Sequence, residues 1–75
     1  MAQNNGSKKL PLQDEFLQRA KEQRVLVTFF LMNGYQLKGL VKSYDSFTVL
    51  IVKEGKELLI FKHAISSIAP MKNLF

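Results

Sequence analysis

The chain lacks cysteine altogether and has a single histidine, His63, among its 75 residues. Without cysteine it can form neither disulfide bonds nor thiolate metal sites. Its six acidic residues are scattered, and its four glycines do not have the spacing of a phosphate-binding loop. The sequence thus shows no nucleophile paired with a base. We expect no enzymatic activity, no cofactor and no metal site.

Long apolar runs are also absent, since no stretch approaches the roughly 20 residues that a membrane span needs. The first residues do not show the pattern of a signal peptide. The sequence therefore predicts a soluble cytoplasmic protein with no membrane partner. A chain this short can bury only a thin core, so association between copies is expected to add stability.

Acidic residues are fewer than basic ones. The chain has eleven Lys and Arg and six Asp and Glu, which gives a formal net charge of +5. A basic surface attracts polyanions, and nucleic acid is the commonest polyanion in cells. The same charge could serve solubility alone. Composition does not separate these two interpretations.

The chain divides into three segments by composition. Residues 1–11 are polar, small and basic without apolar periodicity, which predicts a flexible N-terminal arm. Residues 12–70 carry the periodic patterns of a folded domain, and residues 71–75 form a short C-terminal tail.

Residues 10–23 predict one helix, because their apolar side chains fall on one helical face. These side chains are Leu12, Phe16, Leu17 and Ala20. Pro11 suits the first turn, where a missing N–H group costs nothing.

From Val25 onward the chain is rich in β-branched and aromatic residues, which favour strands. The expected strands are residues 25–32, 35–44, 47–52, 57–62 and 64–69. Asn33-Gly34 predicts a tight hairpin, and Gly39 predicts a bend in the middle of a strand. The apolar run FTVLIV predicts a strand that is covered on both faces.

One helix followed by five short antiparallel strands predicts a mainly β fold, a small and strongly bent open barrel of SH3-like type. The two edges of such a barrel are unpaired, and unpaired edges bind further strands. Head-to-tail addition of copies through these edges would close a ring.

Candidate binding residues lie near the corner Tyr44-Asp45-Ser46, where Asp45 is expected to accept backbone N–H bonds. Single-stranded nucleic acid is held by cations along its backbone and by aromatic rings that stack on its bases. Phe47 could supply such a ring, and Lys62 and His63 could supply donors. The alternatives are a core position for Phe47 and a solvated strand end for Lys62 and His63.

Four segments, LQDEFL, FFLMNGYQLKG, SYDSF and FKHAIS, together resemble the Hfq family of bacterial RNA chaperones, the bacterial branch of the Sm and LSm proteins. The resemblance covers residues 12–70, and FKHAIS is similar to the second Sm motif. It implies an Sm-like fold in a homohexameric ring, in which the fourth strand of one subunit pairs with the fifth strand of the next. It also implies a non-catalytic regulator of small regulatory RNAs and mRNAs.

The resemblance implies a proximal face that binds U-rich RNA around the pore of the ring. It assigns to this face Gln13, Ser46, Phe47, Lys62 and His63. Phe47 would stack on a uracil, Lys62 would reach the base edge, and His63 would contact the RNA backbone, the ribose or the 3′ end. Family members usually carry Gln or Asn where this chain has Ser46, so the contact at that position is expected to be weaker.

The resemblance implies a distal face that binds A-rich RNA. It assigns to this face Phe30, Leu31, Gly34, Tyr35, Leu37 and Lys38, although Phe30 and Leu37 could instead fill the barrel.

The resemblance also implies an RNA-binding surface at the lateral rim of the ring, to which it assigns Lys21 and Arg24. Glu22 adds a negative charge there, and lysine pairs with RNA less specifically than arginine, so weaker annealing of two RNAs is expected.

A second hypothesis is an oligomeric protein-interaction module of SH3-like shape. Such a module would not need a basic face, and its affinity for a peptide would fall less steeply with salt than an affinity for RNA.

Overall fold

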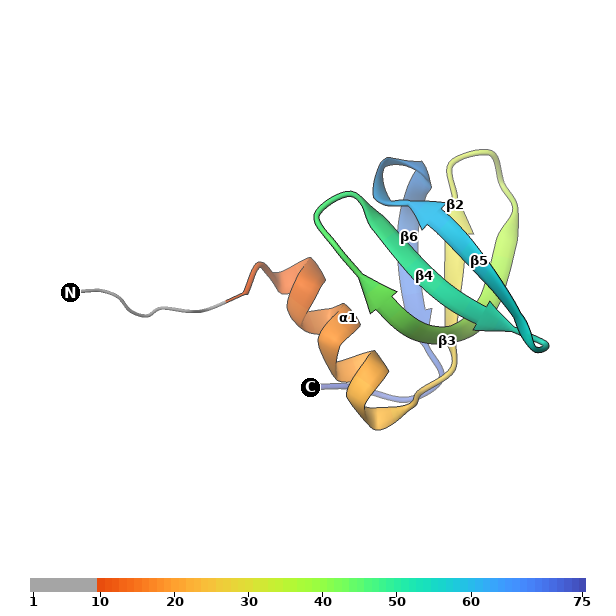
Figure 1. Ribbon diagram of the computed structural model, residues 1–75. Coiled ribbons are helices and arrows are strands. Elements are labelled where there is room, and N and C mark those ends of the chain that lie inside the picture. Colours follow the sequence, from red (N-terminus) through yellow and green to blue (C-terminus); the bar gives the residue numbers. More distant parts are fainter. Residues whose placement is uncertain (1–9) are drawn as a thin grey trace.

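The computed structural model describes residues 10–75, and residues 1–9 of the predicted N-terminal arm lie outside this part (Figure 1). The elements are α1 (Leu12–Gln23), β2 (Val27–Leu31), β3 (Gln36–Tyr44), β4 (Thr48–Lys53), β5 (Lys56–Phe61), the 3-10 turn η1 (Lys62–Ala64) and β6 (Ile65–Pro70). The strands form one antiparallel sheet in the order β5-β4-β3-β2-β6. The predicted helix and five strands are thus confirmed.

Helix α1 begins after Pro11, whose extended backbone (ψ 149°) stands at the N-cap. The predicted apolar stripe is present in part. Leu17 and Ala20 are fully buried, and Phe16 packs against the core. Leu12 was predicted to face inward but remains 71% exposed, because it is the first residue of the helix and borders an open groove instead.

The connection between β2 and β3 is wider than the predicted tight Asn33-Gly34 turn. Only Gly34 has a positive φ there (93°), and the Leu31 N–H group donates to the Tyr35 carbonyl at 2.8 Å. A turn with two positive φ values instead joins β4 to β5, at Glu54 (52°) and Gly55 (79°). The two-residue geometry predicted for Asn33-Gly34 is therefore found in the second hairpin.

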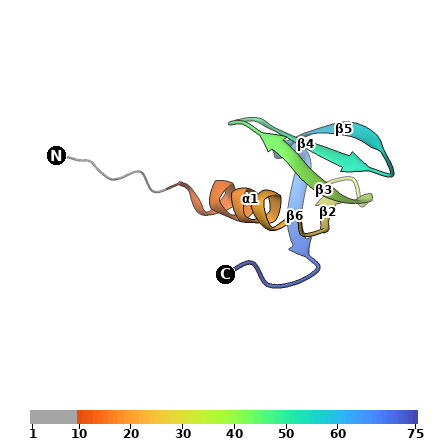
Figure 2. The ribbon, with the colours of Figure 1, turned by 60° about the horizontal axis from the view of Figure 1, so that its bottom comes forward.

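The sheet is strongly bent, as Figure 2 shows from the side, and β3 changes its pairing partner at Gly39. Strand β3 pairs with β2 up to Gly39 and with β4 from Leu40 onward. A Cβ atom on Gly39 would lie 2.7 Å from the Val52 carbonyl oxygen, so only glycine permits this approach of β3 to β4. The predicted bend at this position is confirmed.

The core lies between α1 and the concave side of the sheet. Val49 and Ile51 of β4 are fully buried in it. Leu50 and Val52 lie on the opposite face of β4 and are only half-buried. The prediction that this strand is covered on both faces is therefore wrong for the single chain, because the helix covers one side of the sheet only (Figure 1).

The last residues fold back along α1, which Figures 1 and 2 both show. Leu74 is only 5% exposed and belongs to the core. Its carbonyl oxygen accepts hydrogen bonds from Arg19 Nη1 (3.2 Å) and Gln23 Nε2 (3.5 Å). The Arg19 guanidinium carbon also lies 4.2 Å from the centre of the Phe75 ring. Residues 71–75 are thus packed against the domain.

We expect Leu74→Ala to lower the free energy of unfolding by about 2 kcal/mol, because it removes a buried side chain and leaves a cavity. Urea denaturation at one fixed protein concentration measures this change. Met71→Ala is the control, since Met71 is 64% exposed. Equal effects of the two substitutions would contradict the packing of Leu74 in the core.

Candidate nucleic-acid interface

The corner between β3 and β4 is held by Asp45 and presents the ring of Phe47. Asp45 Oδ1 accepts hydrogen bonds from the Phe47 N–H (2.9 Å), the Thr48 N–H (2.8 Å) and the Thr48 hydroxyl (2.8 Å). The predicted turn role of Asp45 is confirmed. Phe47 is 77% exposed, so the alternative that it belongs to the core is wrong.

The same hydrogen bonds act on the ionisation of Asp45. The Phe47 N–H, then the Thr48 hydroxyl and N–H, hold the pKa of the Asp45 carboxyl below its ordinary value of 3.8. A pKa that is lower in the folded than in the unfolded state means that the ionised carboxylate stabilises the fold. This contribution is complete above pH 3.8 and is lost as the pH falls through the folded-state pKa.

We therefore expect Asp45→Asn to lower the unfolding temperature most near neutral pH. The difference between this variant and the unsubstituted protein should shrink as the pH falls through the folded-state pKa of Asp45, because the carboxylate is then protonated in both states. Thermal unfolding followed by circular dichroism measures the difference at each pH. Glu54→Gln is the control for net charge, because it removes one carboxylate elsewhere in the chain. If the effect of Asp45→Asn on the unfolding temperature did not depend on pH, the role of the Asp45 hydrogen bonds would be wrong.

Lys62 and His63 lie in η1, directly after β5, whereas the expected strand over residues 57–62 included Lys62. The Lys62 N–H donates to the Phe47 carbonyl at 2.8 Å, which holds this turn beside the Phe47 corner. The exposed His63 ring stacks on Phe61, with ring centres 5.7 Å apart and planes inclined by 24°. The structure thus brings together three of the residues that were expected on the proximal face.

The side chain of Lys62 makes a contact that was not predicted from the sequence. Its Nζ donates to Asp14 Oδ1 of α1 at 2.7 Å and lies 5.6 Å from the centre of the Tyr44 ring. The Lys62 side chain is only 12% exposed, so the alternative of a solvated strand end is wrong for this residue. Burial, followed by the charges of Asp14 and Glu22, raises the pKa of the Tyr44 hydroxyl.

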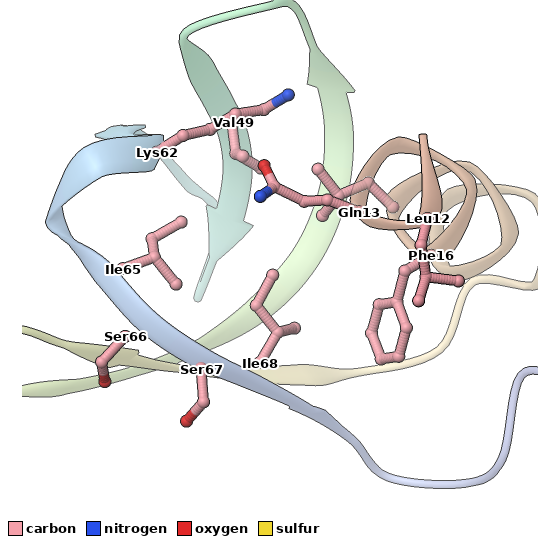
Figure 3. A pocket seen from close by; sticks show the side chains of 10 residues that line it. Leu12, Gln13, Phe16, Val49, Lys62, Ile65, Ser66, Ser67 and Ile68 are labelled. Atoms are coloured by element: carbon pink, nitrogen blue, oxygen red, sulfur yellow. The ribbon is translucent and has the colours of Figure 1, made fainter. Parts of the chain in front are cut away.

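A groove of about 300 Å³ separates α1 from β6 (Figure 3). Gln13 from the helix and Lys62 from η1 border it, and Figure 3 shows both near its upper side. Its apolar wall is made by Leu12, Phe16, Leu17, Val49, Ile65 and Ile68. The groove therefore connects Gln13 with the Lys62 turn. Ser46 does not line the groove and is exposed in the Phe47 corner.

The residues expected on the distal face lie on β2, on β3 and in the loop between them. Tyr35 is 70% exposed in that loop, next to Gly34. The register pairs Leu37 with the fully buried Phe29, and Leu37 packs against the core, as does Leu31. Phe30 pairs with Gln36 on the opposite face, which also carries Lys38. The strand register therefore places Phe30 and Lys38 outward and Leu37 inward.

Lys21 and Arg24, the expected rim residues, lie at the end of α1. Both are exposed, and Arg24 closes the helix in the left-handed conformation, with φ 55°. They line a pocket together with Leu40, Val41, Lys42 and Val52. The strand residues of this pocket were not among the predicted site residues, although Leu40 has the same outward parity as Lys38 and Lys42.

Two kinds of feature are absent from residues 10–75. In this part of the chain no group of three or more histidine, aspartate or glutamate side chains is arranged to hold a metal ion. Its one α-helix, α1, is too short and too polar to span a bilayer.

A helix on one side of a five-stranded, strongly bent antiparallel sheet defines the class of Sm-like proteins, and solved structures of this class superpose on the chain. One, titled the pleiotropic translational regulator Hfq, has a TM-score of 0.76 at 41% identity and covers 79% of this chain and 98% of its own. An Hfq protein from Anabaena sp. has a TM-score of 0.71 at 28% sequence identity. The superposition covers 77% of this chain and 93% of the Anabaena chain.

The sequence comparison identifies the family. The family described as Hfq protein matches residues 12–75, and the chain belongs to the Hfq family. The RNA-binding protein Hfq of Bacillus licheniformis is 54% identical over 67 residues, which cover 89% of this chain and 92% of the relative. The protein of the same name from Bacillus subtilis is 52% identical with the same coverage. The resemblance seen in the sequence motifs is confirmed.

Proposed function

We propose that this protein binds single-stranded RNA without catalysis and acts as an RNA chaperone in post-transcriptional regulation in the cytoplasm. The observation that carries the proposal is the exposed ring of Phe47 beside the Lys62 and His63 turn, since stacking rings next to cations bind single strands. The names of the relatives, RNA-binding protein Hfq, support it. The formal net charge of +5 also favours a polyanionic partner.

We propose that six copies form a ring through the two edge strands. Within residues 10–75, strands β5 and β6 each pair with only one neighbour, so each has a free edge in this part of the chain. Leu59 and Phe61 of β5 are 59% and 52% exposed, and the groove beside β6 is largely apolar. Pairing of β5 with β6 of the next copy would cover these side chains. Such a ring would carry a formal charge of about +30.

Phe47, Lys62 and His63 would form the proximal site for U-rich RNA, with Gln13 contributing from α1. The corner at Asp45 holds the Phe47 backbone in place, so the ring needs little ordering when a base stacks on it. Lys62 is held by Asp14 in the free chain. For Lys62 to reach a base edge, this contact would have to be shared or exchanged.

Tyr35, Phe30 and Lys38 would form the distal site for A-rich RNA. Tyr35 and Phe30 offer rings outside the core, and Lys38 adds a cation on the same face of the strands as Phe30. Leu37, which packs against the core, would support the site from beneath.

Native mass spectrometry of the full chain, alone and with short oligouridine and oligoadenine RNAs, tests this function. We expect hexamers that bind both RNAs at once, because the two proposed sites are built from different elements of the fold. Monomers that bind neither RNA at low salt would overturn the proposal. The protein-interaction hypothesis would be favoured by an affinity for peptides that changes little with salt while RNA binding is absent.

A further inference from the structure

Two exposed aromatic residues are held by the same kind of side-chain contact. The Phe47 N–H donates to Asp45 Oδ1 at 2.9 Å. In the same way, the Tyr35 N–H donates to Asn33 Oδ1 at 3.0 Å. Both rings are largely exposed, Phe47 at 77% and Tyr35 at 70%. A side-chain oxygen two positions earlier thus holds the backbone that carries each ring.

Other exposed rings lack this contact. Phe61 and Phe75 are 52% and 61% exposed, but within residues 10–75 no side chain accepts a hydrogen bond from either N–H group. Phe30, the remaining ring of the proposed RNA sites, belongs to β2 and is held by the pairing of that strand. The contact therefore coincides with the two rings that lie outside the strands and are proposed to stack on bases.

Asn33 supplies the one side-chain acceptor among the described hydrogen bonds of the β2–β3 loop. Three N–H groups of this segment, those of Leu31, Met32 and Gly34, donate to backbone carbonyls at 2.8, 2.8 and 2.9 Å. Within residues 10–75, the acceptor of the Tyr35 N–H is Asn33 Oδ1. Removal of this oxygen leaves the Tyr35 N–H to water and keeps the three backbone bonds.

The contact bears on RNA binding through the cost of ordering the ring. Tyr35 immediately precedes β3, so a change in its backbone angles redirects its ring relative to Phe30 on β2. A ring that is already oriented loses little conformational freedom when a base stacks on it. A ring on a freer backbone has to be ordered by the ligand, and affinity falls by that cost.

We propose that Asn33 is a positioning residue for A-rich RNA: it holds the Tyr35 ring in the orientation that stacks on an adenine and does not touch the RNA itself. This inference rests on the proposed distal site. The role corresponds to that of Asp45 at the Phe47 corner, with a neutral amide as the acceptor in place of a carboxylate.

Asn33→Ala is expected to weaken the binding of a short oligoadenine by about three- to tenfold, the effect of one ordinary hydrogen bond. Oligouridine binding and the unfolding temperature should stay unchanged, because the backbone bonds of the loop remain. Asn33→Ser keeps a side-chain oxygen near the Tyr35 N–H and should recover part of the lost affinity. Asn73→Ala is the matched control, since Asn73 is an exposed asparagine outside the loop.

A double-mutant cycle with Tyr35→Ala separates positioning from direct contact. If Asn33 acts through the Tyr35 ring, Asn33→Ala should change the oligoadenine affinity of the Tyr35→Ala protein by less than about twofold. Fluorescence anisotropy at low salt measures the four affinities. Without RNA, NMR should show faster hydrogen exchange of the Tyr35 amide in Asn33→Ala, because the N–H is then bonded to water.

Three results would overturn the positioning role. Asn33→Ala could bind oligoadenine with unchanged affinity, or it could lose the same affinity for oligouridine as for oligoadenine. Alternatively, it could lose as much in the Tyr35→Ala protein as in the unsubstituted protein, which would make Asn33 a direct RNA contact. A failure of the distal site is recognised separately, because the unsubstituted protein would then not bind oligoadenine at all.

Discussion

Phe47→Ala is expected to weaken binding of a short oligouridine by about tenfold to a hundredfold for each stacked base. The Phe47 ring is 77% exposed, so its removal takes away stacking surface and creates no cavity in the core. The hydrogen bonds of Asp45 are made to the backbone of Phe47 and to Thr48, and alanine preserves them. The loss should therefore appear in RNA affinity and not in stability.

Fluorescence anisotropy with labelled oligouridine and oligoadenine, at one salt concentration, measures this effect. Oligoadenine serves as the internal control, because its proposed site lies on β2, β3 and their loop. The unfolding temperature of Phe47→Ala should stay close to that of the unsubstituted protein. An equal loss of affinity for both RNAs would count against two separate sites.

Tyr35→Ala is expected to have the reverse selectivity, with oligoadenine binding reduced by about tenfold to a hundredfold per stacked base. Tyr35 is 70% exposed, and its backbone is held by hydrogen bonds that do not involve its ring. Its N–H donates to Asn33 Oδ1 at 3.0 Å, and its carbonyl accepts from the Leu31 N–H at 2.8 Å. Alanine therefore leaves the loop intact and removes the ring alone.

Tyr35→Phe is the matched variant, because it keeps the ring and removes only the hydroxyl. It should retain most of the oligoadenine affinity if stacking is the dominant contribution. The same anisotropy titration compares the three proteins. If Tyr35→Phe loses as much affinity as Tyr35→Ala, the hydroxyl and not the ring makes the contact, and the stacking role is wrong.

Local features were predictable where a short stretch of chain sets its own conformation. The Asp45 corner follows from a carboxylate that reaches N–H groups two and three residues ahead. The helix over residues 12–23 follows from the spacing of its apolar side chains. The bend at Gly39 was predicted from a glycine inside a strand pattern, and the approach of the Val52 carbonyl explains it.

Predictions failed where a local signal had more than one solution. Both Asn33-Gly34 and Glu54-Gly55 can form a two-residue turn, and only the second does so. At the first, the Met32 N–H donates to the Ala64 carbonyl at 2.8 Å, which ties the loop to η1. This long-range bond holds a wider loop, and nothing near Asn33 in the sequence indicates it.

By itself the sequence determined the helix, the number of strands, the Asp45 corner and the Hfq motifs, because each depends on residues close together in the chain. Only the tertiary structure decided that Lys62 pairs with Asp14, 48 positions away, and that Leu74 enters the core. It also decided that Leu40 and Val52 meet beside the cations of α1. Such contacts depend on strand register and on the curvature of the sheet, which many residues set together.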